Sequence, residues 1–318
     1  MSGRILALAG GVGGAKLALG LSKALPPDAL TVAVNTADDF EHLGLSISPD
    51  LDTVMYTLAG LANPETGWGR QGESWTVMDA LGALGGETWF RLGDKDLAIH
   101  IERTRRLRSG ESLASATRDL AARLGVRTAM VPMSDDPVRT NVTTNLGELA
   151  FQDWFVRLRC EPVVTSVHFA GADVARPHPV LLDLTGLRGI IVCPSNPFVS
   201  VAPILAMPGV QEALGQARVP RVAVSPIVGG QAIKGPAAKM LAELGHEVSA
   251  LGVARFYSAW IDGFVLDAQD AALAADITAL GVRARVSDTM MRNDADKRRL
   301  AEEVLDFVDE LAVSGRHS

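Results

Sequence analysis

Short apolar, β-branched runs recur along this chain, and a residue pattern typical of a helix follows each of them. Six such runs read RILALA, LTVAVN, RGIIVCPSNP, RVAVSPIVGG, DGFVLD and VRARVS. Strands that alternate with helices favour a parallel sheet, because parallel neighbours need long crossover connections. We therefore expect an α/β protein whose mainly parallel sheet is covered by helices on both faces.

Amphipathic patterns mark the helices that would cover this sheet. The chain ends in a pattern with one apolar stripe, which predicts a helix packed along one side. Its apolar residues are Leu300, Val304, Leu305, Val308 and Leu311. The other predicted core helices span residues 14–25, 201–217 and 236–245.

The middle of the chain reads differently. Residues 63–125 contain helical patterns at 74–86, 94–110 and 112–125, with no strong strand run except TWFRL. Short β segments follow, with a turn at 134–137, before the sheet is expected to resume near PVVTSVHF. No linker separates independent domains. The prediction is one domain over 1–318, with a core of about 1–62 and 160–318 and an inserted, mainly helical lobe of about 63–159.

Composition excludes several classes of protein. The 318 residues are 47% hydrophobic and 21% charged, a globular composition, and the net charge of -7 argues against a protein that coats nucleic acid. No apolar run approaches the length of a membrane span, and glycines stand where a signal peptide would have its apolar centre. Only Cys160 and Cys193 are present, which fits a reducing compartment. We expect a cytoplasmic protein.

A glycine cluster follows the first predicted strand, in the stretch LAGGVGGAKL. Gly10, Gly11, Gly13 and Gly14 leave backbone amides uncovered where a strand turns into a helix, and Lys16 follows them. Amides at a helix N-terminus, with the helix dipole behind them, can bind a phosphate or a nucleotide. A tight turn without a ligand is the alternative.

This cluster departs from the two common phosphate-binding fingerprints. A P-loop needs a glycine before its lysine and a hydroxyl after it, but Ala15 and Leu17 stand there. The dinucleotide pattern GxGxxG can begin at Gly11, yet Lys16 fills its third glycine position. Only the general chemistry of exposed amides remains.

Acidic residues follow the second predicted strand. NTADDF supplies Asn35, Asp38 and Asp39, and SPDLDTV supplies Asp50 and Asp52 at the start of a helix. The carboxyl edge of a parallel sheet is where ligands bind, and clustered carboxylates suit Mg²⁺ held partly through substrate phosphates. Solvated loop acids, one of them capping the helix, are the alternative.

Further polar groups occur at later turns. RLGDKDLAIH places Arg91, Asp94, Lys95 and Asp96 around a glycine turn, where the start of a surface helix is the simpler reading. CPSNPFVS and SPIVGGQAIKGP each follow a strand, so their polar side chains and free amides can hold a base or phosphates. Turns stiffened by the neighbouring prolines are the alternative. The residues concerned are Ser195, Asn196, Ser225, Gly229 and Gly230.

Three tryptophans gather in the predicted lobe. Trp68, Trp75 and Trp89 could stack on a flat ligand, although core packing is the commoner role of such side chains.

Eight motifs occur in a fixed order along the chain: GGVGGAKL, VNTADD, SPDLDTV, LGDKD, MSDDPVRT, FQDWFV, CPSNP and SPIVGG. Together they resemble the 2-phospho-L-lactate transferase family, which builds the deazaflavin coenzyme F-420, from the first loop to about Met291. The resemblance implies a Rossmann-like three-layer fold, a homodimer and a need for magnesium. It also implies transfer of a phosphorylated three-carbon acid from a guanosine diphosphate conjugate to the ribityl hydroxyl of the deazaflavin Fo, with release of GMP.

The resemblance also suggests roles for individual residues. Asp52 and Arg91 match the positions that bind the deazaflavin, where many relatives have lysine in place of Arg91. The turns at 10–14, 195–196 and 225–230 would surround the guanosine nucleotide, with Lys16 and Asn35 among the substrate-binding residues. Mg²⁺ would be held by Asp38, Asp39, Asp50 and Asp52. Asp52, with Asp50 beside it, would orient the ribityl hydroxyl and accept its proton.

Two other functions compete with this reading. A related fold family binds nucleotide sugars through a similar glycine-rich start, in a regulatory and non-catalytic role. A nicotinamide dehydrogenase is disfavoured by the broken fingerprint. The sequence leaves open whether lactate, enolpyruvate or glycerate is the three-carbon acid.

Overall fold

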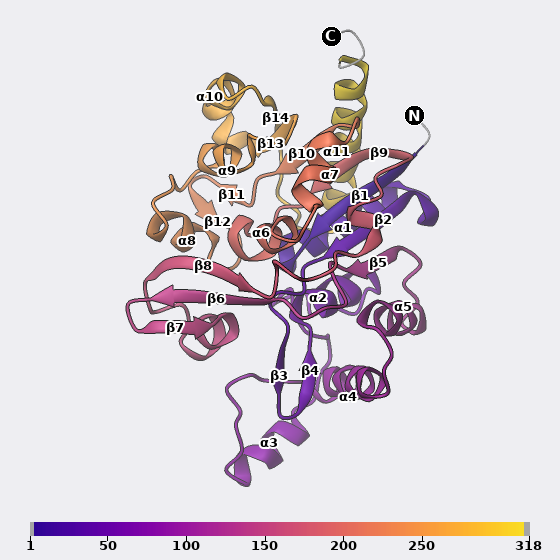
Figure 1. The fold of residues 1–318 in the computed structure, drawn as a ribbon, viewed down its shortest axis with the longest axis vertical. Helices are drawn as coiled ribbons and strands as arrows, with labels where there is room; N and C mark the ends of the chain where they lie inside the picture. Colours follow the sequence, from indigo (N-terminus) through magenta and orange to yellow (C-terminus); the bar gives the residue numbers. More distant parts are fainter. Residues whose placement is uncertain (1–2, 315–318) are drawn as a thin grey trace.

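A seven-stranded sheet lies at the centre of the molecule (Figure 1), in a computed structural model that describes residues 3–314. Residues 1–2 and 315–318 of the expected single domain lie outside the described range. The strand order is β14-β13-β10-β9-β1-β2-β5, and every neighbouring pair is parallel. The strands are β1 (Arg4–Ala9), β2 (Leu30–Val34), β5 (Ala129–Pro132), β9 (Leu187–Val192), β10 (Arg221–Val224), β13 (Gly263–Asp267) and β14 (Arg283–Ser287). All six expected core strands are therefore confirmed.

Each face of this sheet is covered by its own hydrophobic core. In β1, Ile5 and Ala7 pack on one face, and Leu6 and Leu8 on the other, as the two-residue period of a strand requires. The first face is covered by α1 (Gly11–Ala24), α2 (Pro49–Leu58), α5 (Leu113–Arg123) and α11 (Asp294–Ser314). The second is covered by α6 (Ala202–Leu205), α7 (Val210–Gln216), α8 (Ala237–Glu243), α9 (Ala250–Tyr257) and α10 (Ala274–Ala279). The fold is the expected three-layer, Rossmann-like α/β fold.

The boundary predicted for the inserted lobe is wrong at two strands. β5 falls inside the range 63–159 but pairs with β2 as the edge strand of the core sheet. β8 (Val164–Ala170), where the core was expected to resume, instead joins a separate antiparallel sheet with β6 (Arg139–Thr144) and β7 (Gly147–Ala150). Most β8 side chains are exposed or half-buried, whereas strands in the middle of a parallel sheet are buried on both faces.

The three helices predicted for the lobe are present, and beside them lies an unpredicted hairpin that belongs to the range predicted for the core. α3 (Thr76–Ala83), α4 (Asp94–Arg108) and α5 follow one another, and β3 (Phe40–His42) pairs with β4 (Leu45–Ile47). The hairpin and α3 project away from the central sheet (Figure 1). The TWFRL run forms no strand. It is an irregular segment in which Phe90 packs edge-on against Phe40, with ring centroids 4.9 Å apart.

The helix predicted over 201–217 is divided. α6 ends at Leu205 and α7 begins at Val210, with a turn around Pro208, whose ring cannot continue a helix. No single helix among residues 3–314 is long and apolar enough to cross a membrane, and only the bent pair of Pro197–Leu205 and Val210–Gln216 meets that test jointly. A small hairpin joins β11 (Ile227–Val228) to β12 (Gln231–Ala232). Short helical turns span Pro27–Ala29, Asp153–Arg157, Pro179–Leu181, Pro197–Val201 and Ala268–Leu273.

The contact between α1 and α11 gives a test of the core. A Cβ atom on Gly20 of α1 would lie 2.1 Å from the carbonyl oxygen of Lys297, so Gly20→Ala must separate the two helices. We expect this substitution to lower the free energy of unfolding by about 1–3 kcal/mol, measured by urea denaturation. The control is Gly215→Ala in α7, where a Cβ meets nothing within 4 Å and alanine favours the helix. Equal effects of the two substitutions would contradict this account of the packing.

Candidate active site

The main cavity of the molecule has a volume of about 830 Å³ and lies at the carboxyl edge of the central sheet. Its walls come from the turn after β1, the loop after β2, α2, the start of α4, and the loops after β9 and β10. Segments far apart in the sequence therefore meet at one site. Of the residues predicted from sequence, those that line it are Gly10, Gly11, Gly13, Lys16, Asp38, Asp50, Asp52, Arg91, Ser195, Asn196 and Ser225.

Five of the predicted residues do not line this cavity. Gly14 is buried within α1, and Asn35 is buried behind Asp50. The exposed turn between β11 and β12 holds Gly229 and Gly230, and the Gly229 amide donates a hydrogen bond to Asp270. The fifth, Asp39, faces a different cavity.

The glycine turn after β1 is fixed against the loop after β9. A Cβ atom on Gly13 would lie 2.2 Å from the carbonyl oxygen of Pro194, so only glycine permits this approach. The Ser195 hydroxyl donates to the Gly10 carbonyl at 2.9 Å and accepts from the Gly10 amide at 3.2 Å. The start of α1 is thus held in place at the cavity wall.

Asp50 joins this turn to the end of β2. Its carboxylate accepts a hydrogen bond from the Gly11 amide at 2.7 Å and another from the Asn35 side chain at 2.9 Å. Burial raises the pKa of Asp50 to about 6, and these two hydrogen bonds oppose the shift. Asp50 is therefore a buried acid that lines the cavity and ionises near neutrality.

Asp38 is a second buried acid at the same wall. Its Oδ1 atom is buried and has no hydrogen-bond partner among residues 3–314. Burial raises the pKa of Asp38 well above its ordinary value, and the charges of Asp50 and Asp39 add to the effect. A pair of neighbouring carboxyl groups in this state is stabilised by a cation between or beside them.

Asp39 points elsewhere. Its carboxylate accepts a hydrogen bond from the Ser48 hydroxyl at 2.7 Å, and it lines a second cavity of about 140 Å³ together with Arg139. Burial raises the pKa of Asp39 to about 7. The structure does not bring this carboxylate to the main cavity with Asp38 and Asp50.

Asp52 is held in a buried ion pair that the sequence analysis missed. Each of its oxygens contacts the guanidinium of Arg103, which comes from α4 and is 1% exposed. Arg103 lies in the run ERTRRLR, where four arginines share one helix and nothing in the pattern distinguishes Arg103 from the other three. The pair ties α2 in the core to α4 in the lobe.

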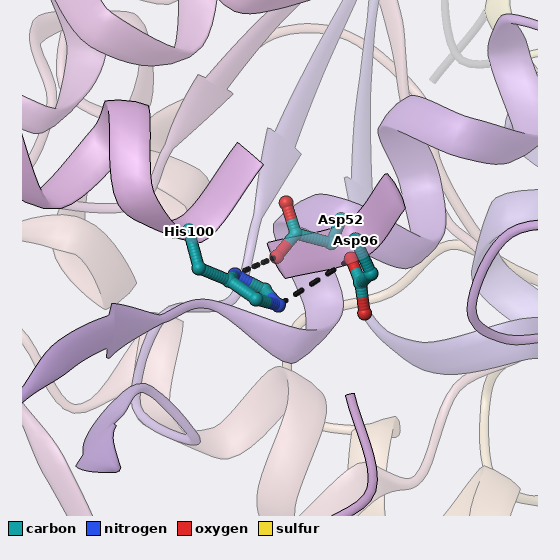
Figure 2. A group of neighbouring side chains, drawn as sticks. All are labelled: Asp52, Asp96 and His100. Carbon is teal, nitrogen blue, oxygen red and sulfur yellow. Dashed lines mark ion pairs between the residues drawn. The ribbon is translucent and has the colours of Figure 1, made fainter. Parts of the chain in front are cut away.

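His100 and Asp96, also from α4, continue this network (Figure 2). The Nδ1 atom of His100 lies 3.6 Å from Asp52, and its Nε2 atom lies 3.4 Å from Asp96. The hydroxyl of Tyr56 donates to the same oxygen of Asp96 that faces His100. All of these side chains except Arg103 line the cavity. The spacing of four residues between Asp96 and His100 was a readable signal, because it puts both on one face of a helix.

An aromatic and basic wall lies beside this network. The guanidinium of Arg91 stacks over the ring of Trp75 at 4.3 Å, and Trp68 lines the cavity and is largely exposed. Trp89 instead packs against Phe40 and under Arg157. Of the three tryptophans considered for stacking on a ligand, Trp68 lines the cavity, whereas Trp75 and Trp89 do not.

Comparison with known proteins decides the family. Residues 5–306 match the family described as 2-phospho-L-lactate transferase CofD. The chain belongs to this family. The phosphoenolpyruvate transferase of Streptomyces griseus is 43% identical to it, over 97% of this chain and 99% of that protein. The 2-phospho-L-lactate transferase of Methanosarcina mazei is 39% identical, over 95% of this chain and 99% of that protein.

Membership of this transferase family confirms the resemblance read from the eight motifs, and with it the enzyme class. A solved structure described as a UPF0052 family member from Bacillus halodurans has a TM-score of 0.61 and 16% identity, over 96% of this chain and 99% of that one. At that identity the likeness shows the fold alone.

The buried ion pair provides a test of the site's architecture. Arg103→Met leaves Asp52 buried without its partner, so we expect the free energy of unfolding to fall by about 3–5 kcal/mol in urea denaturation. Adding Asp52→Asn should recover part of that loss, because the uncompensated charge is gone. Arg105→Met is the control, since Arg105 is exposed and Glu102 is its only ion-pair partner within the described range. Equal losses from the two arginine substitutions would contradict the assignment.

Proposed function

We propose that this protein transfers a phosphorylated three-carbon acid from a guanosine diphosphate conjugate to the ribityl hydroxyl of the deazaflavin Fo, with release of GMP. One observation carries the proposal: the glycine turn, the buried acids Asp38 and Asp50, and the side chains of Arg91 and Trp68 all line the same cavity. A transfer between two bound ligands needs such a shared cavity, because the reacting groups must be aligned and water kept out.

The donor's phosphates fit the end of the cavity formed by the glycine turn. α1 has fourteen residues, and its first amides and dipole favour an anion there. Lys16 lies in the first turns of this helix with its ammonium 3.3 Å from the Met291 carbonyl. Burial lowers the pKa of Lys16, with Lys297 and Lys234 adding to the effect, so a bound anion would stabilise its charged form.

Asp38 and Asp50 are the residues that would hold Mg²⁺. Both fit a hard cation, because they are buried oxygen donors at the cavity wall and one Asp38 oxygen is unpartnered among the described residues. When bound, the ion would neutralise charge on the diphosphate and on the departing nucleotide. Asp39 and Asp52 are left out of this set, because Asp39 faces the small cavity and Asp52 is bonded to Arg103.

The deazaflavin fits the other end of the cavity. Arg91 over Trp75 gives a flat cationic surface, and Trp68 adds an exposed ring, both suited to a planar, electron-rich ligand. Asp52, which matches a family position for this ligand, supports that end through its pair with Arg103. The homodimer and the cytoplasmic location remain predictions.

The transfer reaction itself can be measured by mass. The protein is incubated with Fo, Mg²⁺ and, in separate reactions, the phosphoenolpyruvyl and phospholactyl conjugates of guanosine diphosphate. We expect a deazaflavin product heavier by the phosphorylated acid of one conjugate, with one GMP released per product. This comparison also identifies the three-carbon acid, on which the relatives named above differ. Nucleotide binding without product from any conjugate would contradict the proposal and favour a non-catalytic binder.

Cation binding should depend on pH. The pKa of Asp50 is raised to about 6, so Asp50 becomes protonated below that pH and loses its affinity for a cation. We expect Mn²⁺ binding, measured by calorimetry, to weaken at least about tenfold per pH unit below 6, because the raised pKa of Asp38 adds a second carboxyl group that is protonated as the pH falls. Asp38→Asn should weaken binding at every pH, whereas Asp39→Asn should have a much smaller effect, because Asp39 influences the site only through its charge. Equal loss in both variants would contradict the assignment of the ligands.

A further inference from the structure

The network around His100 has two carboxylates, but only one has an oxygen free for a ligand. We propose that Asp96 receives a hydroxyl group of the acceptor's polyol chain, and that His100 and Tyr56 are positioning residues that fix its orientation. This inference rests on the proposed function and assigns a ligand-binding role to residues that the motif comparison left without one.

Both carboxylate oxygens of Asp52 already have partners within the protein. Arg103 contacts both of its oxygens, and the Nδ1 atom of His100 lies beside one of them. A buried, bidentate arginine pair is rigid and strongly bound, so a substrate hydroxyl would compete with a full positive charge for the same oxygens. Asp52 is therefore an anchor for α4.

Arg103 also sets the tautomer of His100. Its Nη1 atom lies 3.3 Å from His100 Nδ1, and a guanidinium can only donate, so Nδ1 must be the accepting nitrogen. In the neutral ring the hydrogen then sits on Nε2, which faces Asp96 Oδ1 at 3.4 Å. The ring is buried, with 2% of its side chain exposed, so this orientation is held by packing as well.

Asp96 is restrained on one oxygen only. Its Oδ1 atom receives the Tyr56 hydroxyl and faces His100, while no donor among residues 3–314 is bonded to Oδ2. Figure 2 shows Oδ1 directed at His100 and the second oxygen directed away from it. Because Asp96 lines the cavity and is partly exposed, Oδ2 is an oriented hydrogen-bond acceptor available to a ligand.

The position of Asp96 along the chain suits a polyol chain attached to a flat ring. Asp96 lies in the first turn of α4, five residues after Arg91, and both line the same cavity. The backbone amide of Asp96 donates to Glu73 at 3.0 Å, which holds this turn in place. One short segment thus supplies a surface for the ring and an acceptor for its hydroxyl groups.

A metal ion is the other ligand that this group of residues suggests. Asp52, Asp96 and His100 offer one atom each within 4.8 Å of one another. However, Arg103 occupies both Asp52 oxygens and faces His100 Nδ1, so a cation there would sit against a buried guanidinium. The geometry therefore favours a neutral donor, such as a hydroxyl, over a metal.

The test compares two acceptor analogues in three proteins. Binding of Fo, and of the same deazaflavin ring with a methyl group in place of the ribityl chain, is followed by ligand fluorescence for wild type, Asp96→Asn and the control Asp94→Asn. Asp94 is half-buried, and among residues 3–314 its carboxylate bonds only to Ser74, Thr76 and Val77, outside the network around His100. We expect wild type and the control to prefer Fo, and Asp96→Asn to lose about tenfold or more of that preference. GDP affinity should stay within twofold, since the donor lies at the other end.

Several outcomes would overturn the inference. It fails if Asp96→Asn keeps the wild-type preference for Fo, or if Mn²⁺ binding is lost in Asp96→Asn while the Fo preference is kept. If Asp96→Asn does not fold, the same assay is done with Tyr56→Phe. Loss of the Tyr56 hydroxyl removes a restraint on Asp96 and should reduce the preference for Fo about threefold. An unchanged preference in this variant would overturn the proposal. A wild-type protein that binds GDP but neither deazaflavin would instead overturn the proposed function.

Discussion

A buried carboxylate joins the three segments on which the cavity depends. Asp50, at the start of α2, accepts hydrogen bonds from the turn after β1 and from Asn35 at the end of β2. These bonds fix the uncovered amides of α1 beside the acidic loop, in the arrangement an anion and a cation can share. Burial works against the charge that the site needs, so Asp50 ionises near pH 6 instead of near 4.

The helix that carries Asp50 presents two different acids to its two sides, one toward the glycine turn and one toward α4. Each residue rotates the side-chain direction about the helix axis by about 100°, so residues two apart are related by about 200° and lie on nearly opposite sides of the helix. Asp50 accordingly faces the glycine turn, while Asp52 faces α4 and pairs with Arg103. One turn of α2 thus supports the phosphate side with one acid and anchors the lobe with the other. The spacing seen in SPDLDTV has a structural reason that a simple count of acids misses.

The sequence predicts most of the core and part of the site. Five of the six core strands are visible because strands buried on both faces read as continuous apolar runs, whereas β14, at the edge of the sheet, is visible from its alternating VRARVS pattern. The glycine turn and Asp50 follow from their place at the carboxyl edge. β5 was misassigned because a strand of four residues carries little pattern. β8 was recognised as a strand, but its sequence does not say which sheet it joins, because partner choice depends on the folded lobe. Arg103, His100 and Tyr56 were missed because they converge only when α4 packs against α2. Asp39 was grouped with Asp38, although adjacent loop residues can point into different cavities.

The central claim is that donor and acceptor meet in one cavity, with phosphates at the glycine turn and the ring beside Arg91. A crystal structure of the protein with GDP, Fo and Mn²⁺ tests this most directly. The account predicts the diphosphate within hydrogen-bond distance of the amides of Val12 and Gly13, since Asp50 already accepts from the Gly11 amide. It places the ion on Asp38 and Asp50, and the ribityl chain between them and α4. A structure with GDP and Fo in separate cavities, or with the diphosphate away from α1, would contradict it.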